Sequence, residues 1–239
     1  MKGRIHSLQS LGAADGPGLR YIVFMQGCPY RCVYCHNPDT WATDTGEEYT
    51  ADAIIERVMR CKTYFGKDGG VTVSGGEPLL QAAFVRELFT ELHERGTHCV
   101  LDSSLMMDGE DARALISEAD MILADVKFTD DERVQTLCGG SLAALERNLE
   151  LAARNEIPVV TRTVIVPGLN DSDTELEGLA AFTKRYPNIV KCELLPFRKF
   201  CIEKYRMAGI LFPLEQTPEA DKAAVKAMEI RLSELRKNI

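Results

Sequence analysis

The feature that most constrains the fold is the regular alternation of short apolar, β-rich segments with amphipathic segments of helical period. Six segments are predicted to be strands: residues 21–26, 71–73, 99–101, 121–124, 159–166 and 190–195. Helical patterns fall between and after them, at residues 50–59, 79–95, 111–118, 141–154, 173–185 and 217–237. Strands that alternate with helices pair in parallel through right-handed crossovers. The sequence therefore predicts an α/β protein with helices over the outer face of one sheet.

Polar and turn-forming residues stand where the predicted strands end, and this placement favours one of two possible sheets. Six strands are too few for a closed eight-stranded barrel, which leaves a partial (β/α)6 barrel of the TIM type or a flat doubly wound sheet. The residues at or just beyond carboxyl-terminal strand ends are Cys28, Gly75, Asp102, Asp125, Pro167 and Arg198. In barrel enzymes that edge carries the active site, so we expect the partial barrel.

The bulk properties of the chain exclude several classes of partner. No linker, repeat or low-complexity stretch interrupts the pattern, so residues 1–239 are expected to form a single domain. A formal net charge of −8 argues against general binding to nucleic acid or anionic lipid, which requires a basic surface. The first residues lack the apolar core of a signal peptide, and no apolar run approaches membrane-spanning length. We expect a cytoplasmic monomer that binds neither nucleic acid nor membranes.

Three of the eight cysteines are crowded into one short segment, at Cys28, Cys32 and Cys35. The others are scattered and are interpreted as ordinary buried small hydrophobic residues: Cys61, Cys99, Cys138, Cys192 and Cys201. Thiolates hold iron–sulfur clusters, and a cubane has four irons, so three ligands in one loop leave one iron free for a non-protein ligand. The spacing therefore predicts a [4Fe–4S] cluster with one open iron.

Two other kinds of site also use closely spaced cysteines. A structural zinc site needs four ligands, and the nearby candidate, His36, is directly adjacent to Cys35 and poorly placed to join the same tetrahedron. A ferredoxin-type site includes a fourth cysteine. A non-catalytic iron–sulfur or zinc regulator that senses oxygen through this loop remains an alternative from a different functional class.

These residues resemble the motifs of radical S-adenosylmethionine (SAM) enzymes. Cys28-x3-Cys32-x2-Cys35, with Tyr34 before the last cysteine, is similar to their cluster motif, and Gly75-Gly76-Glu77 is similar to their GGE motif. More narrowly, the chain resembles the pyruvate formate-lyase activating enzyme family of glycyl radical enzyme activases along nearly its whole length. The further segments that carry this resemblance are residues 15–20 (DGPGLR), 34–37 (YCHN), 125–127 (DVK), 164–168 (VIVPG) and 193–196 (ELLP).

The resemblance implies reductive cleavage of SAM at the cluster and removal of a hydrogen atom from a glycine of a partner enzyme. Pyruvate formate-lyase is the expected partner, and a different glycyl radical enzyme is the alternative. Many activases of the second kind carry an inserted domain with extra cysteine clusters, whereas this chain has only Cys61 between Cys35 and Gly75. That difference favours pyruvate formate-lyase. A flavodoxin or ferredoxin is implied as the reductant.

The resemblance also assigns roles to residues at the predicted strand ends. Glycines at Gly75 and Gly76 permit close backbone approach, so nearby carbonyls could bind the SAM ammonium. By resemblance, Lys127 and Arg162 lie near the SAM carboxylate and ribose, and Tyr34 near the adenine. Residues of the matched motifs that are also expected at the cofactor are His36, Asn37, Glu77 and Val126. Asp102, Ser103 and Asp125, with the Leu123 carbonyl, are implied to surround a monovalent cation, and Asp15 to hold the target peptide.

The chain departs from the family pattern at a few positions, and these departures bear on which partner enzyme it activates. The chain has Ser103-Ser104-Leu105 where the family usually has Thr-Asn-Gly, Arg198 where it has a histidine, and Cys201 near an expected glycine. Arginine carries a permanent charge and a forked set of donors, so we expect Arg198 to point into the site and bond SAM or the target.

A local charge balance suggests how an electron donor could be guided. Residues 1–41 contain Lys2, Arg4, Arg20 and Arg31 against Asp15 and Asp39, a balance of 4 − 2 = +2 in a protein that is acidic overall. A positive face near the cluster would attract an acidic flavodoxin or ferredoxin.

Overall fold

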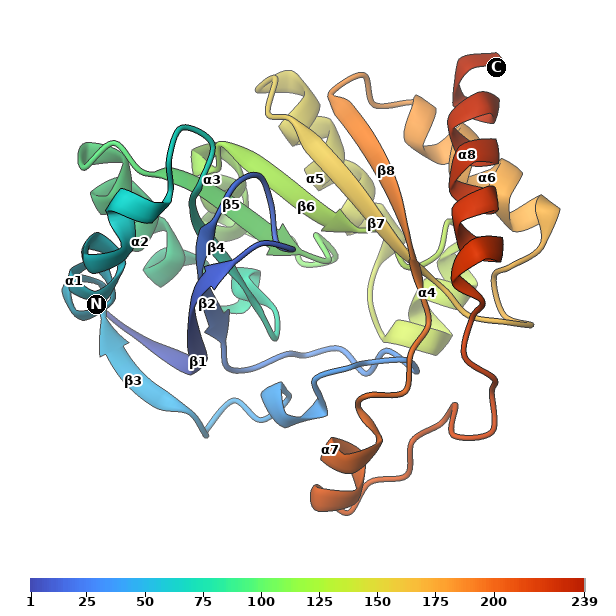
Figure 1. Ribbon diagram of the computed structural model, residues 1–239, viewed down its shortest axis with the longest axis horizontal. Coiled ribbons are helices and arrows are strands. Elements are labelled where there is room, and N and C mark those ends of the chain that lie inside the picture. Colours follow the sequence, from blue (N-terminus) through green and yellow to red (C-terminus); the bar gives the residue numbers. More distant parts are fainter. Residues whose placement is uncertain (239) are drawn as a thin grey trace.

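A computed structural model describes residues 1–238 of the protein. The strands form one open, curved sheet (Figure 1). Its eight strands have the spatial order β3-β1-β2-β4-β5-β6-β7-β8. The strands are β1 (Lys2–Gly12), β2 (Arg20–Met25), β3 (Glu47–Thr50), β4 (Gly70–Gly75), β5 (His98–Ser103), β6 (Met121–Asp125), β7 (Val159–Ile165) and β8 (Ile189–Pro196). All neighbours from β2 to β8 are parallel, while β1 pairs antiparallel with β2 and β3. The partial barrel predicted from the sequence is confirmed.

Helices flank the curved sheet (Figure 1). They are α1 (Ala51–Cys61), α2 (Ala82–Glu94), α3 (Glu110–Glu118), α4 (Asp131–Cys138), α5 (Leu142–Arg154), α6 (Asp173–Lys184), α7 (Ile202–Met207) and α8 (Lys222–Asn238), with short 3-10 turns at Pro38–Thr40, Lys62–Tyr64 and Pro78–Gln81. Three helix starts are capped by a hydroxyl, since Thr50, Ser141 and Ser172 each accept a hydrogen bond from a first-turn amide. Within residues 1–238, no helix combines the length and apolar character that crossing a bilayer requires.

The predicted elements and the observed ones differ in a few places. All six predicted strands are present, and they are the six parallel ones. The two antiparallel strands were missed because β1 alternates weakly and β3 has four mostly exposed residues. The short helices α4 and α7 were also missed, and the last helix begins at Lys222 rather than at residue 217.

Side chains that alternate along the central strands form two layers inside the barrel. Leu123 and Val160 pack with Val100 in a small buried cluster. Two residues further along the same strands come Asp102, Asp125 and Arg162, and the period of two places them on the same inner face. Along these three strands, the inner face is therefore apolar at Val100, Leu123 and Val160 and charged two residues further on, toward the carboxyl-terminal ends.

A buried arginine holds the loop that enters the barrel between β1 and β2. The Arg20 side chain is fully buried; it donates to the Thr72 hydroxyl (2.6 Å) and to the Val71 carbonyl (2.6 Å), among other backbone oxygens. Thr72 in turn donates to the Asp15 carbonyl (2.6 Å). The glycine-rich loop is thereby fixed from below, and Asp15 reaches the cavity described next.

This burial corrects the predicted positive face. Arg20 contributes nothing to the surface, and Lys2 and Arg4 are paired with Glu48 on the β1–β3 edge. Of the four cations counted, Arg31 is the one within the cysteine loop, where it stacks on Trp41 at 4.6 Å. The excess of positive charge in residues 1–41 is therefore not gathered beside the cysteines.

Candidate active site

A cavity of about 300 Å³ lies at the carboxyl-terminal ends of the parallel strands, under the cysteine loop. Fifteen of the residues that the sequence predicted for the site line it: Asp15, Cys28, Cys32, Tyr34, Cys35, His36, Asn37, Gly75, Gly76, Glu77, Asp102, Ser103, Asp125, Lys127 and Arg162. They come from the loop before β2, the loop after it, and the ends of β4 to β7. Parallel strands bring their carboxyl ends to one edge, which is why residues so distant in sequence meet here.

The cysteine loop is fastened at both of its sides. The amides of Gly27 and Cys28 donate to the carbonyls of Thr40 and Trp41. On the other side, the amides of Arg31 and Val33, which flank Cys32, donate to carbonyls at the end of α4 (2.9 Å each). The three thiols are thus presented on a loop whose backbone is hydrogen-bonded to two other parts of the chain.

The three thiols differ in pKa because their surroundings differ. Burial raises the pKa of Cys28 to about 12 and also raises that of Cys35. The Cys138 thiol, at the end of α4, donates to Cys32 and lowers the pKa of Cys32 to about 7. Cys138 was interpreted from the sequence as an ordinary buried residue; it is fully buried, but it also contacts a predicted cluster ligand.

Among the described residues, one group of possible metal ligands has all its ligand atoms within 4.8 Å of one another: His93, Cys99 and Asp120. None of these three residues lines the cavity, so this group is separate from the cysteine loop.

The turn after β4 requires its two glycines. A Cβ on Gly75, whose φ is +103°, would lie 2.4 Å from the Met25 nitrogen, and one on Gly76 would lie 2.2 Å from the Gly27 carbonyl oxygen. The close approach lets the Gly76 amide bond Met25 and the Glu77 amide bond Gly27 (2.9 Å each). The turn is therefore locked against the start of the cysteine loop, and only glycine fits there.

Glu77 is a fully buried carboxylate held by hydroxyl and amide donors. It accepts hydrogen bonds from the Ser103 hydroxyl (2.6 Å), the Ser104 hydroxyl (2.5 Å) and amide (3.1 Å), and the Leu79 amide (3.1 Å). Burial raises the pKa of Glu77, and the two serine hydroxyls oppose that shift. The Ser103-Ser104 departure from the family pattern therefore serves to fix the GGE turn to the end of β5.

The next residue, Leu105, keeps the left-handed backbone that the family's glycine would adopt without strain. Its φ is +54°, and its side chain is fully buried. The Asn148 side chain donates to the carbonyls of Leu105 and Met107, which holds this turn in place. Packing and these hydrogen bonds offset the unfavourable backbone conformation.

Two acidic and two basic side chains form a compact group at the cavity wall. Arg162 donates to Asp102, lies 3.5 Å from Asp125 and reaches within 4.0 Å of Asp15. Lys127 donates to Asp125 at 2.7 Å. Burial would raise the pKa of Asp125, but Lys127 and Arg162 outweigh it and lower that pKa. Burial would likewise lower the pKa of Lys127, yet Asp125 and Cys32 raise it well above its ordinary value. Burial raises the pKa of Asp102, and Arg162 opposes that shift.

Three of the four predicted cation ligands, Asp102, Ser103 and Asp125, line the cavity, but their surroundings differ from the expectation. The Arg162 guanidinium stands between Asp102 and Asp125 and supplies positive charge there. Ser103 directs its hydroxyl hydrogen to Glu77, and Asp102 also accepts from the Ser74 hydroxyl (2.7 Å).

Three predicted residues do not line the cavity: Leu123, Val126 and Arg198. Arg198 was expected to point inward, but its guanidinium bonds the Ala220 carbonyl (2.9 Å) and lies 3.3 Å from Glu219. Its backbone carbonyl is the part that meets the site, because it accepts from His36 Nε2 (2.8 Å). Burial lowers the pKa of His36, so the ring is neutral and carries its proton on the nitrogen that donates.

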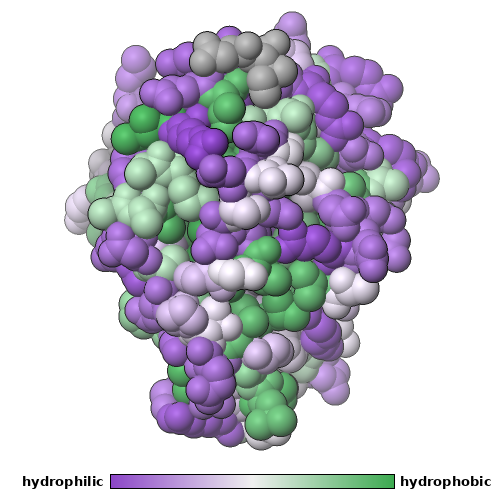
Figure 2. Space-filling view, turned by 90° about the vertical axis from the view of Figure 1, so that its right-hand side faces the viewer, coloured by the Kyte–Doolittle hydropathy of each residue, from purple (hydrophilic) through white to green (hydrophobic). Residues whose placement is uncertain are grey.

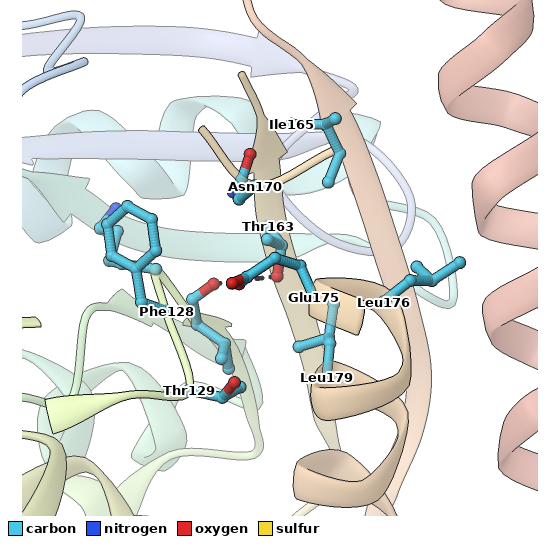
Figure 3. Close-up of a pocket in the computed structure, with 10 residues that line it drawn as sticks. Phe128, Thr129, Thr163, Ile165, Asn170, Glu175, Leu176 and Leu179 are labelled. Carbon is cyan, nitrogen blue, oxygen red and sulfur yellow. Dashed lines mark hydrogen bonds between the residues drawn. The ribbon is translucent and has the colours of Figure 1, made fainter. Parts of the chain in front are cut away.

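Lys127 also borders a second, much smaller pocket on the far side of β6 and β7. Figure 3 shows this pocket, with Phe128 and Thr129 on one side and Glu175 and Leu179 of α6 on the other. Its volume of about 20 Å³ is close to the minimum that holds one water molecule. It is a packing gap behind the cavity wall, and the chemistry belongs to the larger cavity.

Several lining residues were missed by sequence reasoning. Ser74 directly precedes the GGE motif and could have been found from that position, and Ser104 was noticed only as a departure. Val164 and Leu195 also line the cavity; both lie in segments that carry the family resemblance, but no role was predicted for them. Tyr30 lines it without a sequence signal that sets it apart from core residues.

Comparison with known proteins defines the class first. Residues 22–178 match the family model of the radical SAM superfamily. Among solved structures, a domain of pyruvate-formate lyase-activating enzyme from Bacteroides vulgatus matches with a TM-score of 0.57 and 20% identity, covering 70% of this chain and 94% of that one. QueE from Escherichia coli matches with a TM-score of 0.55 and 16% identity, covering 88% and 92%. The chain has the radical SAM fold and belongs to the radical SAM superfamily.

Relatives that are similar in sequence identify a single family within this superfamily. The pyruvate formate-lyase-activating enzyme of Staphylococcus aureus (strain USA300) is 41% identical over 236 residues, which cover 95% of this chain and 94% of the relative. Within the superfamily, the chain therefore belongs to the family of pyruvate formate-lyase-activating enzymes.

Proposed function

We propose that this protein generates a glycyl radical on a partner enzyme, and that pyruvate formate-lyase is that partner. The observation that carries the proposal is the meeting of three separate features on one cavity: the three-cysteine loop, the GGE turn and the charged group around Arg162. The name of the 41% identical relative supports the choice of partner.

The donor set fits the two groups that the superfamily uses. Cys28, Cys32 and Cys35 would hold a [4Fe–4S] cluster, and the cations Lys127 and Arg162 lie in the same cavity for the SAM carboxylate. With both bound, the cluster would supply the electron for reductive cleavage of SAM to methionine, and the 5′-deoxyadenosyl group would leave as 5′-deoxyadenosine after taking a hydrogen atom from a glycine Cα, which would leave a glycyl radical on the partner. The chain's own residues bind, orient and shield these reactants.

The remaining site residues take roles around that reaction. Carbonyls at Gly75 and Gly76 would accept from the SAM ammonium, and Tyr34, His36 and Asn37 would bound the nucleoside side. Asp15, fixed from below by Thr72, would hold the target peptide. Val126 would act through its backbone only, since its side chain is fully buried.

The expected monovalent cation can be reconciled with the observed ion pairs. The SAM carboxylate competes with Asp102 and Asp125 for Arg162, which now bonds or approaches both. If Arg162 turns to SAM, the two aspartates lose a counter-charge that a monovalent cation can supply, with Ser103 and the Leu123 carbonyl as neutral ligands. SAM and the cation would then bind cooperatively.

The electron would come from a flavodoxin or ferredoxin, and the protein would act in the cytoplasm as a single-domain monomer. The alternatives are activation of a different glycyl radical enzyme and a non-catalytic, oxygen-sensing role for the cluster loop. The three differ in whether SAM is turned over and in which protein receives the radical.

One experiment separates these possibilities. The protein is reconstituted anaerobically with iron and sulfide and reduced with dithionite, and 5′-deoxyadenosine formation from SAM is measured. It is then incubated with purified pyruvate formate-lyase and, separately, with another glycyl radical enzyme, and radical yield is read by electron paramagnetic resonance. A glycyl radical on pyruvate formate-lyase is expected. A cluster without SAM turnover would favour the regulator, and a radical only on the second enzyme would reassign the partner.

A further inference from the structure

The segment after β8 projects beside the mouth of the cavity and is firmly anchored on its inner side. Tyr205 of α7 is almost fully buried; its ring packs on Trp41 (5.8 Å between centroids) and on Phe212 (4.8 Å). Lys204 of the same helix donates to Asn37 of the cysteine loop (2.8 Å). This anchoring joins the segment to a loop whose residues line the cavity.

The outer side of the same segment is apolar and exposed. Phe200, Met207 and Leu211 are 81%, 87% and 88% exposed, and Ile210 is 41% exposed. Figure 2 shows hydrophobic side chains reaching the surface at the narrow lower end of the molecule, at the level where Figure 1 places α7. We call these four residues the 200–211 surface. Exposed apolar side chains gathered in this way typically mark an interaction site.

The charged residues around the 200–211 surface neutralise one another. Arg206 pairs with Glu203 (2.5 Å) and lies 3.8 Å from Glu215, while Arg198 lies 3.3 Å from Glu219. Little net charge is therefore left to attract a partner from a distance, and the available attraction is the burial of apolar area.

We propose that the 200–211 surface docks the protein whose glycine enters the cavity, and that it does so through apolar contact. This inference rests on the proposed function: a glycine of a folded enzyme can reach the cavity only if that enzyme covers the rim of the mouth. The surface adjoins that rim, because Lys204 of α7 bonds Asn37, which lines the cavity. The chemistry of the partner's matching face is a patch of apolar side chains beside the exposed glycine segment.

The test uses the reconstituted enzyme and the double variant Met207→Ser/Leu211→Ser. Both side chains are exposed, so the fold and the cavity are left intact. We expect the apparent KM for purified pyruvate formate-lyase to rise by about tenfold, because two apolar contacts of an interface together contribute on that scale. The rate of 5′-deoxyadenosine formation without partner, and radical formation on a short peptide with the target glycine, should equal those of the wild type.

A matched control and a salt series complete the experiment. Val190→Ser removes an exposed apolar side chain at the opposite end of β8 and should not change KM. KM of the wild type should change little with ionic strength, since the contact is apolar. A wild-type KM in the double variant, or an equal rise in the Val190→Ser control, would overturn the docking surface alone. Failure of the wild type to form a radical on either the folded enzyme or the peptide would overturn the proposed function, and the docking surface with it.

Discussion

Two buried arginines, one toward each end of the barrel, are held in opposite ways. Arg20 donates to the Thr72 hydroxyl, to backbone carbonyls and to His98 Nδ1 (3.2 Å), and no carboxylate lies among its hydrogen-bond partners in the described part of the chain. Arg162 is held by the carboxylates Asp102 and Asp125 and approaches a third, Asp15. Burial lowers the pKa of Arg20 to about 10, whereas the two aspartates raise that of Arg162 despite its burial.

The difference separates a structural end of the barrel from a chemical one. Backbone carbonyls cannot leave Arg20 without unfolding the strands that carry them, so its contacts are permanent. Carboxylates on separate strand ends can exchange one cation for another, and an anionic ligand can compete for Arg162 in return. The charge of Arg162, which is neutralised by aspartate side chains, is therefore available to bind an anionic group of a cofactor.

The largest expected effect lies at the chemical end. Replacing any one of Cys28, Cys32 or Cys35 with Ala should abolish 5′-deoxyadenosine formation, because the cluster loses one of its three protein ligands. Iron content and turnover are the measurements, and Cys61→Ala is the control. Retained turnover in all three variants would mean that the cysteine loop is not the cluster site.

The two arginines give a direct test of the comparison when each is replaced by Gln. Arg162→Gln leaves Asp102 and Asp125 buried without their shared cation, at a cost of about 3–5 kcal/mol of unfolding free energy at neutral pH. Asp125 keeps its pairing with Lys127, but the pKa of Asp102, which burial already raises, rises further above the unfolded value of about 3.9. The folded form then binds more protons, and the variant regains stability relative to the wild type as pH falls toward that value.

Arg20→Gln should also destabilise the protein, by about 3 kcal/mol, because several buried carbonyls lose their donor. Carbonyls do not titrate, but burial and Arg20 lower the pKa of His98, whose Nδ1 contacts the guanidinium. In a His98→Asn background, which removes this titratable ring, the loss should stay constant between pH 7 and pH 4. Urea unfolding of both variants across that range measures the contrast. If the unfolding free energies of the two variants changed with pH in the same way, the proposed difference between the two ends of the barrel would be wrong.

A smaller effect is expected where the GGE turn meets β5. Ser104→Ala removes the hydroxyl donor to Glu77 and should cost about 2 kcal/mol, as for other hydrogen bonds to charged groups. The pKa of Glu77, already raised by burial, rises further, so the deficit relative to wild type should grow as pH increases above about 4.3. Ser117→Ala on the outer helix α3 is a control, and an equal deficit at pH 4 and pH 7 would show that Glu77 is not the group involved.

The smallest effect is expected for Arg198. Its guanidinium lies on Ala220 and Glu219 rather than in the cavity, so Arg198→Ala should leave SAM affinity within about twofold of wild type. Equilibrium binding of SAM to the reconstituted protein is the measurement. A tenfold or greater loss of SAM affinity would show that Arg198 binds the cofactor, as the sequence predicted.

The parallel strands, the partial barrel and the cysteine loop could all be predicted, because each follows from patterns within short stretches of the sequence. Hydrophobic period and turn residues determine the βα units, and the ligand spacing at Cys28, Cys32 and Cys35 lies within a few residues. The weakly patterned β1, the four-residue β3 and the short α4 and α7 carry too little local signal to be found that way.

The sequence by itself determined which residue types stand at the carboxyl ends of the strands, and hence the class of chemistry. Only the tertiary structure decided their partners: Cys138 beside Cys32, Ser103 and Ser104 on Glu77, Arg162 between two aspartates, and Arg20 inside the barrel rather than on its surface. These contacts join segments tens of residues apart, and their geometry follows from the register and curvature of the sheet, which no local pattern encodes.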